Sequence, residues 1–344
     1  MKSDRKLVRV LEGGVEKTPP VWLMRQAGRY LSEYRAVREK AGSFWGMALN
    51  PALASEVTIQ PIRRFGFDAA ILFSDILTVP EALGQKVTFT AGEGPSMAPV
   101  TSTDGFVTDR DAWANYFEPV YEALRMTRAG LDKEGFQTTT LLGFAGAPWT
   151  LATYLAAGVG GDEQKAAKLW AYRDPQGFAR LLDILGECIA FHLIRQIDAG
   201  ADAVQIFDSW AGGVPPVLFE DVVIKPAKKI VDAVRAERPN ARIIGFPRAV
   251  TQSGYEAYVK AVPVDAVSLD TSAPLGWAAK ALDCTVQGNL DPIALIAGGD
   301  ALDRAVDAIA QAMDGKAHIF NLGHGILPET PIAHVEQLLK RIRK

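Results

Sequence analysis

The sequence predicts an α/β protein in which residues 1–344 form a single catalytic domain, a (β/α)8 TIM-like barrel with its active site at the carboxyl ends of the strands. Eight short apolar runs recur along the 344 residues, and helical patterns separate many of them. Most of these runs are continuously apolar, as expected for parallel strands that helices cover on both faces. A doubly wound open sheet is the alternative, because periodicity alone does not separate the two folds.

The eight predicted strands share a short apolar core that ends in a polar or glycine-containing turn. In chain order they are Val21–Met24, Ala69–Phe73, Thr139–Phe144, Ala203–Phe207, Arg242–Phe246, Ala266–Leu269, Thr285–Gly288 and His318–Leu322. Between the second and third strands, the stretch Glu81–Asp109 departs from the rhythm. We expect it to form an excursion with a short hairpin near Gln85–Thr90, covering part of the site.

Helical patterns separate or follow many of these strands. They are Pro51–Phe65, a helix beginning at Asp174–Pro175, Asp221–Arg238, Gly254–Val262, Asp291–Met313 and Pro331–Arg343. Asn50 before Pro51, and Asp174 before Pro175, each place a favourable N-cap residue ahead of proline at the first helical position.

The composition is that of a soluble globular protein. Hydrophobic residues make up 48% of the chain and charged residues 22%, which excludes a disordered protein. No apolar run is long enough to span a membrane, and the N-terminal MKSDRKLVRVLEGG lacks the apolar segment of a secretory signal. Cys188 and Cys284 lie far apart without a CxxC motif, so we expect a cytoplasmic protein without a disulfide framework.

Charge is unevenly distributed along the chain. The net charge is −3, which by itself disfavours a nucleic-acid partner. Residues 1–64 nevertheless carry 12 Lys and Arg against 6 Asp and Glu, and the remaining residues carry 25 against 34. Such an asymmetry indicates either a local anion site on an acidic protein or a chance distribution.

Motifs for the common cofactors are absent. No GxGxxG follows a strand, and GxxxxGK[ST], HExxH and GxSxG do not occur. The four histidines are not spaced as a metal cluster. We therefore expect no metal and no organic cofactor.

Polar residues follow several predicted strands, where a barrel collects its chemistry. Arg25 and Arg29 follow the first strand, Asp75 the second, Tyr154 the third, Ser209 the fourth and His324 the eighth. Arg25, Arg29, Arg35 and Arg38 together suit a ligand with several carboxylates or phosphates, because a guanidinium binds each of these groups bidentately. The alternative for the arginines is a solvated basic helix.

Other candidate site residues also have ordinary structural alternatives. Asp75 lies between apolar residues and is either a desolvated site carboxylate or a helix cap. Phe144 and Phe207 form either an apolar wall or ordinary core. Glycines flank His324 and suggest a turn that holds its ring near a ligand, although a lone histidine is often structural.

Four segments in order resemble the uroporphyrinogen decarboxylase family: PPVWLMRQAGRYLSEYR, AAILFSDIL, GFAGAPWTLATY and NLGHGILPET. The resemblance runs from about Pro20 to His334. It implies a distorted barrel, a homodimer, a cytoplasmic location and no cofactor. It also implies that uroporphyrinogen III is the substrate, and that CO2 is lost from its four acetate groups to give coproporphyrinogen III.

The resemblance also assigns roles to individual residues. Asp75 and Arg25 are the implied catalytic residues, with Asp75 near the pyrrole N–H groups and Arg25 at the reacting acetate. The implied substrate-binding set adds Gln26, Arg29, Arg38, Phe144, Tyr154, Phe207, Ser209 and His324. One departure is Ser32, where the family usually has proline.

Two other functions are considered. A zinc-dependent cobalamin or thiol methyltransferase shares this barrel, but His324 has no neighbouring cysteine in the sequence. A non-enzymatic tetrapyrrole carrier would use the same arginines, yet would not need Asp75 at the ring nitrogens.

Overall fold

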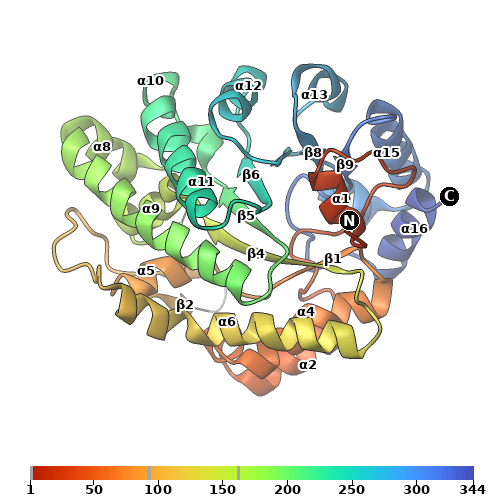
Figure 1. Cartoon of the computed structure of the whole chain (residues 1–344), viewed down its shortest axis with the longest axis horizontal. Helices are drawn as coiled ribbons and strands as arrows, with labels where there is room; N and C mark the ends of the chain where they lie inside the picture. Colours follow the sequence, from red (N-terminus) through yellow and green to blue (C-terminus); the bar gives the residue numbers. More distant parts are fainter. Residues whose placement is uncertain (1–2, 91–93, 161–162) are drawn as a thin grey trace.

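Seven parallel strands form the centre of the fold. The computed structural model describes residues 3–90, 94–160 and 163–344. The strands are β1 (Ala69–Ile71), β4 (Thr140–Gly146), β5 (Ala203–Asp208), β6 (Ile243–Pro247), β7 (Ala266–Ser268), β8 (Thr285–Gln287) and β9 (His318–Ile319). They are paired in that order. A doubly wound sheet has a point at which the strand order reverses, and this sheet has none among the described residues. Helices surround the curled sheet, which confirms the predicted TIM-like class (Figure 1).

The prediction of a full strand at Val21–Met24 is wrong, because only one residue of this segment forms a β-bridge. Val21 bridges Phe320, beside β9. Toward β1, the Asp68 N–H donates to the Val21 carbonyl at 2.8 Å, and the Val21 N–H donates to the Asp68 side chain at 2.8 Å. Pro20 has no N–H to extend the ladder, which limits the pairing. Residues 20–26, with their neighbours at 68–69 and 320–326, form what we call the seam between the two edge strands.

Helices cover the outside of the sheet. Four of them match the predicted positions closely: α4 (Pro51–Phe65), α9 (Pro175–Asp198), α12 (Gln252–Ala261) and α16 (Ile332–Ile342). The Asn50 side chain accepts a hydrogen bond from the Leu53 N–H, and Asp174 accepts one from Gly177, so both predicted N-caps are confirmed.

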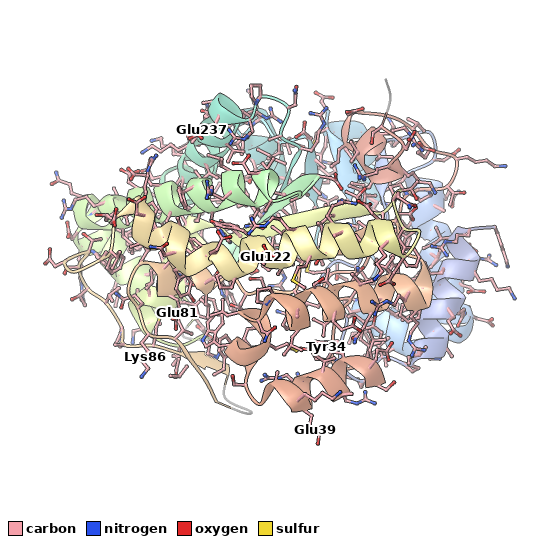
Figure 2. The ribbon with its side chains drawn as sticks, turned by 60° about the horizontal axis from the view of Figure 1, so that its bottom comes forward. Tyr34, Glu39, Glu81, Lys86, Glu122 and Glu237 are labelled. Atoms are coloured by element: carbon pink, nitrogen blue, oxygen red, sulfur yellow. The ribbon has the colours of Figure 1, made fainter. Side chains whose placement is uncertain are left out.

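The sequence analysis did not predict several other helices. They are α1 (Lys6–Leu11), α2 (Ser32–Ala41), α3 (Phe44–Ala48), α5 (Thr78–Ala82), α6 (Arg110–Lys133), α7 (Pro148–Ala157), α8 (Lys165–Arg173), α10 (Pro216–Phe219) and α13 (Leu275–Ala281). The longest of these, α6, lies beside α4 on the outside of the fold (Figure 2).

Two predicted helices differ from the structure in detail. Asp221–Arg238 begins with a π-helical turn, Glu220–Ile224, before α11 (Lys225–Glu237). Asp291–Met313 is not continuous but is divided into α14 (Pro292–Ala297) and α15 (Gly299–Ala312). Gly298 breaks the helix with a φ of +65°, and a Cβ there would overlap the imidazole of His334. Packing against α16 therefore favours a glycine at this break.

The apolar residues form an inner and an outer cluster. The inner cluster fills the space that the strands enclose, and α1 contributes Leu7, Val10 and Leu11 to it. The Thr285 hydroxyl donates to the Val10 carbonyl at 2.7 Å, which fixes α1 at the amino ends of the strands. The outer cluster lies between helices and sheet, and its members run from Val21 to Leu339 in the sequence.

The predicted excursion at Glu81–Asp109 contains the expected hairpin, although residues 91–93 lie outside the described ranges. β2 (Thr88–Thr90) pairs antiparallel with β3 (Gly94–Ser96). The ring of Phe89 packs against Phe44 and Trp45, with centroids 4.5 and 5.1 Å apart. The hairpin is thereby attached to α3. In the parts of the chain that the structure describes, no helix combines the length and apolar character needed to cross a membrane.

Ser32 occupies the first position of α2, where proline is favoured. Its N–H makes no backbone hydrogen bond to a described residue, and Leu31 before it is extended, with φ −89° and ψ 130°. We expect Ser32→Pro to raise the free energy of unfolding by about 0.5–1 kcal/mol, because proline restricts the unfolded chain. Calorimetric melting midpoints measure this change.

Ala36→Pro, one turn further into α2, is the matched control. It removes an interior N–H and is expected to cost about 3 kcal/mol. A lower midpoint for Ser32→Pro than for the wild type would contradict our description of this helix start.

Candidate active site

The predicted site residues lie beyond the carboxyl ends of strands at one end of the sheet. They follow different elements: Arg25 and Arg29 come after the seam residue Val21, Asp75 after β1, Tyr154 in α7 after β4, Ser209 after β5 and His324 after β9. The charge of Arg25 lowers the pKa values of Asp75, Tyr154 and His324. These four side chains therefore lie within electrostatic range at the carboxyl end of the sheet, the end that we call the opening of the fold.

Arg25 is held in place by the seam. Its backbone is left-handed, with φ +62°, a conformation that costs a non-glycine residue about 1–2 kcal/mol. The preceding Met24 N–H donates to the Asn321 side chain at 2.9 Å, and the Met24 carbonyl accepts from Ile326 at 2.8 Å. A Cβ on Gly325 would overlap the Arg25 side chain. The glycine after His324 thus makes room for the arginine.

Gln26 is fully buried, and its side chain links the seam to β1. Its carbonyl oxygen accepts from the Leu23 N–H at 3.1 Å, and its amide donates to the Ala69 carbonyl at 2.9 Å. No atom of Gln26 is exposed for a ligand to touch. In this structure the Gln26 side chain therefore holds the segment before Arg25 against β1, and the implied binding role of Gln26 stays a prediction.

Asp75 combines partial burial with hydrogen bonds to the turn that leads into α5. Its carboxylate accepts from the Leu77 N–H at 2.8 Å, and its carbonyl accepts from the Thr78 hydroxyl at 2.8 Å, at the start of α5. Burial raises the pKa of Asp75 to about 6, against the opposing effects of the Leu77 N–H and Arg25. The carboxylate is therefore ionised near pH 7 although it has lost most of its water.

Tyr154 and His324 are both neutral near pH 7. Burial raises the pKa of Tyr154, while a hydrogen bond with the Trp210 side chain lowers it in part. Burial lowers the pKa of His324 to about 4, and the charges of Arg248 and Arg25 add to that effect. His324 thus offers a carboxylate a hydrogen bond from a neutral ring rather than a positive charge.

Arg29 and Arg38 are grouped around Tyr34 of α2. Both charges lower the pKa of Tyr34, which burial raises. The guanidinium of Arg38 lies over the Phe44 ring, 5.7 Å from its centroid, and one of its terminal nitrogens is buried without a hydrogen-bond partner in the described residues. Arg29 is exposed, and its backbone carbonyl accepts a hydrogen bond from the Arg35 guanidinium at 2.7 Å.

Positive charge in the N-terminal part of the chain is partly uncompensated. Ion pairs with carboxylates are formed by Arg5, Lys6, Arg9, Arg63 and Arg64. Within the described ranges, no carboxylate pairs with any of the four arginines between positions 25 and 38, namely Arg25, Arg29, Arg35 and Arg38. The excess charge of residues 1–64 is therefore partly available to an anion.

Three phenylalanine rings belong to the inner cluster near the site. Phe207 is perpendicular to Phe144 at 5.6 Å and nearly perpendicular to Phe246 at 6.0 Å. Phe207 is 8% exposed and Phe144 is half-buried. Both predicted residues are packed as core, and Phe144 retains surface that an apolar ligand face can contact.

The sequence analysis missed Arg248, which follows β6. Its guanidinium donates to the Ser209 carbonyl at 3.2 Å, and its charge lowers the pKa of His324. The signal was present, because Arg248 comes two residues after the predicted strand Arg242–Phe246 and directly after the observed β6.

Cysteine ligands are not found at this end of the sheet. Cys188 is buried within α9, and burial raises the pKa of its thiol far above neutrality. Cys284 precedes β8 at the amino end of that strand, and burial raises its pKa to about 11. Among the described residues, no group of three or more His, Cys, Asp or Glu side chains is arranged to hold a metal ion.

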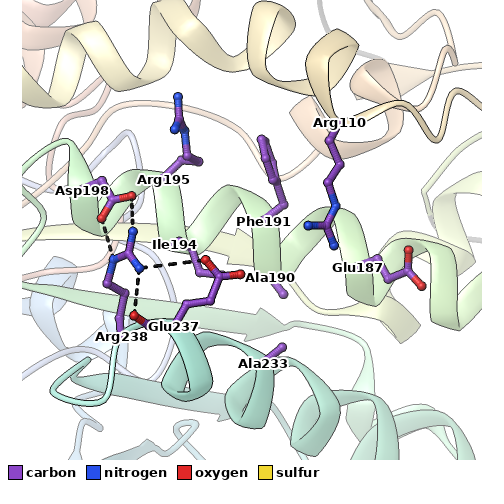
Figure 3. Close-up of a pocket in the computed structure, with 10 residues that line it drawn as sticks. All are labelled: Arg110, Glu187, Ala190, Phe191, Ile194, Arg195, Asp198, Ala233, Glu237 and Arg238. Atoms are coloured by element: carbon purple, nitrogen blue, oxygen red, sulfur yellow. Dashed lines mark hydrogen bonds and ion pairs between the residues drawn. The ribbon is translucent and has the colours of Figure 1, made fainter.

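A cavity of about 250 Å³ lies away from this site, between α6, α9 and α11 (Figure 3). Arg238 binds Asp198 there through two hydrogen bonds of 2.7 and 2.6 Å, so this charge is already paired. None of the predicted site residues lines this cavity.

Comparison with known proteins adds family information to this geometry. A family model described as uroporphyrinogen decarboxylase (URO-D) matches residues 2–344. The uroporphyrinogen decarboxylase of Rhizorhabdus wittichii is 52% identical over 343 residues, which are 99% of this chain and 98% of that protein. The uroporphyrinogen decarboxylase of Brucella anthropi is 51% identical over 340 residues, 98% of both chains.

Solved structures share the fold at low sequence identity. A methyltransferase from Methanosarcina mazei has a TM-score of 0.81 and 18% identity, covering 100% of this chain and 99% of that one. A B12-independent methionine synthase from Shewanella has a TM-score of 0.57 and 10% identity, covering 95% of this chain and 96% of that one. These likenesses establish a shared fold only.

The raised pKa of Asp75 has a consequence for stability. The folded protein holds the Asp75 proton more tightly than the unfolded chain does. The tighter binding of this proton stabilises the folded protein. This stabilisation is fully present below about pH 4 and is lost as the pH rises through about 6. We expect Asp75→Asn to melt at a higher temperature than the wild type at about pH 8, with the difference narrowing toward about pH 4.

Asp307→Asn is the control, for which the expected change in melting temperature has the opposite sign. A hydrogen bond from Arg341 lowers the pKa of Asp307, so the pair stabilises the fold above the unfolded pKa and loses that effect as the pH falls. Asp307→Asn should therefore melt slightly lower than the wild type at about pH 8. An Asp75→Asn protein that melts below the wild type at that pH would show that the carboxylate is not desolvated.

Proposed function

The chain belongs to the uroporphyrinogen decarboxylase family, and we propose that it removes CO2 from the four acetate side chains of uroporphyrinogen III to give coproporphyrinogen III. The observation that carries this proposal is the desolvated carboxylate of Asp75 within range of Arg25. A tetrapyrrole with carboxylates around an N–H-rich centre matches both groups: the carboxylates suit the arginine, and the N–H groups suit Asp75.

The reaction needs a place for the electrons left when the bond to CO2 breaks. A pyrrole ring that is protonated at carbon is cationic and accepts this electron pair, so the substrate is its own electron sink. Asp75 accepts hydrogen bonds from the pyrrole N–H groups and stabilises the positive charge of the protonated ring. Because Asp75 is already poorly solvated, it attracts this charge more strongly than a carboxylate in water would.

Arg25 acts at the reacting acetate in this proposal. Its left-handed backbone and the packing of its side-chain stem on Gly325 fix where the side chain leaves the seam. A guanidinium pKa above about 12 makes it a reluctant proton donor, so binding the carboxylate is the role that its chemistry favours. Gln26 supports this role by tying the segment to β1.

The remaining predicted residues bind the periphery of the substrate. Arg29 and Arg38 supply cations beside Tyr34, and each charge-assisted hydrogen bond contributes about 1.5–3 kcal/mol. Tyr154, Ser209 and His324 offer neutral donors to other carboxylates. Phe144 and Phe207 provide apolar surface for the ring faces.

Two other functions have less support. A methyltransferase that binds zinc through histidine and cysteine would need a cysteine at this opening, and the described residues place none there. A carrier would bind the same carboxylates but would gain nothing from the desolvation of Asp75, which costs stability above pH 6.

We further propose a homodimer in the cytoplasm, both implied by the family. Cys188 and Cys284 are free thiols, in keeping with a reducing compartment. No nucleic-acid partner is expected. Light scattering of the purified chain measures the oligomeric state.

We expect Asp75→Asn to lose at least 100-fold in turnover while keeping its fold, because the amide carries no charge to stabilise the protonated pyrrole. CO2 release from uroporphyrinogen under oxygen-free conditions, with coproporphyrinogen as product, measures this loss.

Asp291→Asn is the matched control, because Asp291 also follows a strand and its carboxylate also accepts from the N–H two residues later, that of Ile293 at 2.9 Å. It should retain wild-type turnover. Near-normal CO2 release by a folded Asp75→Asn protein would remove Asp75 from the mechanism, and an inactive wild type would reject the function itself.

A further inference from the structure

We propose that Arg248 is a further substrate-binding residue, which holds a peripheral carboxylate of the tetrapyrrole on the side of the opening that faces away from Arg25. This inference rests on the proposed function and deepens it. It assigns a cation to the part of the site beside Ser209, for which the sequence predicted only a neutral donor.

The strand order places the two arginines on opposite sides. Arg25 follows the seam segment, which lies between β9 and β1. Moving from the seam through β1, β4 and β5 leads to β6, and moving the other way through β9, β8 and β7 leads to β6 as well. Arg248 follows β6, so it lies across the opening from the segment that carries Arg25.

The backbone of Arg248 is anchored on both sides. Its N–H donates to the Asp208 carbonyl at 3.1 Å, and its carbonyl accepts from the Gly212 N–H at 2.9 Å. The next residue, Ala249, is left-handed with φ +61°, and its N–H donates to the buried Asp270 at 3.0 Å. Such conformations persist in non-glycine residues only where the surroundings hold them, often at functional sites. The side chain therefore leaves from a fixed point.

The guanidinium of Arg248 keeps most of its donors free. Of its five N–H donors, one terminal nitrogen binds the Ser209 carbonyl at 3.2 Å. Its Nε is buried and has no hydrogen-bond partner in the described residues, and no carboxylate there forms an ion pair with Arg248. Leaving such a donor unsatisfied is unfavourable, and an anion at the opening would satisfy it.

A second arginine of β6 shows the contrast. Arg242, at the amino end of the strand, pairs with Glu12 at 2.7 Å and donates to the Asn240 carbonyl at 2.9 Å. The Nε of each arginine is buried without a hydrogen-bond partner in the described residues, so this atom does not distinguish them. The difference is the carboxylate: Arg242 pairs with Glu12, whereas no described carboxylate pairs with Arg248 at the active-site end of the strand. This difference is expected if the substrate supplies the partner of Arg248.

Electrostatics give Arg248 a role that its neighbours cannot fill. Ser209 carries no charge, and the lowered pKa of His324, about 4, keeps that ring neutral. Both neighbours can donate hydrogen bonds to a carboxylate, but neither balances its charge. The charges of Arg248 and Arg25 both act on His324, and Arg248 is the one that also contacts Ser209. Arg248 therefore provides that balance beside Ser209.

The test compares Arg248→Gln with Arg242→Gln as the matched control. For Arg248→Gln we expect the KM for uroporphyrinogen to rise about 10- to 100-fold, the size of one charge-assisted hydrogen bond, while kcat changes less than about threefold. Arg242→Gln should leave both constants unchanged. Arg248→Lys keeps the charge without the fork and should lie between the wild type and Arg248→Gln.

Direct binding separates this inference from the proposed function. Equilibrium dialysis of uroporphyrinogen without oxygen, in an Asp75→Asn background, should show about 10- to 100-fold weaker binding when Arg248→Gln is added. If the wild type releases no CO2 but binding still depends on Arg248, the decarboxylase proposal fails and the carboxylate site stands.

Two results would overturn the Arg248 site. One is that Arg248→Gln releases CO2 with the same KM and the same dissociation constant for uroporphyrinogen as the protein without this substitution. The other is a loss confined to kcat that Arg248→Lys does not restore, which would indicate a structural role. If Arg248→Gln does not fold, Arg248→Lys decides alone, and an unchanged KM and dissociation constant in that variant reject the proposal.

Discussion

The electrostatic coupling between Arg25 and the desolvated carboxylate of Asp75 is the interaction on which the site depends. Arg25 comes from the seam and Asp75 from the end of β1, so the two lie within electrostatic range of each other only because the seam joins the edges of the sheet. The Met24 bond to Asn321 and the Gln26 bond to Ala69 fix that join. The hydrogen bonds that close the sheet at the seam are therefore also the ones that place Arg25 near Asp75.

This arrangement gives up stability for function in several places. Asp75 retains its charge in a partly buried position, Arg25 has a left-handed backbone, and Arg248 keeps a buried donor without a partner in the described residues. Each feature is unfavourable in the free protein. A cationic, polycarboxylate substrate intermediate would relieve the first and the third, which is how binding energy is directed to the reacting groups.

Much of the fold is predictable from local sequence, and the exceptions have physical causes. Asn50–Pro51 and Asp174–Pro175 marked helix starts correctly because capping depends on adjacent residues. The seam was predicted as a full strand because its apolar residues resemble one, whereas its pairing depends on distant partners. The hydrogen bond from the Gln26 amide to the Ala69 carbonyl could not be predicted, because the two residues lie far apart in the sequence. Arg248 was overlooked although it obeys the strand-end rule that identified Arg25.

The most direct test of the central interaction is the pKa of the Asp75 carboxyl group, measured by carbon-13 NMR in the free protein. Burial predicts a value of about 6, and removing the opposing charge in Arg25→Gln should raise it further. A wild-type value near about 4, or a value that does not respond to Arg25→Gln, would contradict a desolvated carboxylate coupled to that arginine.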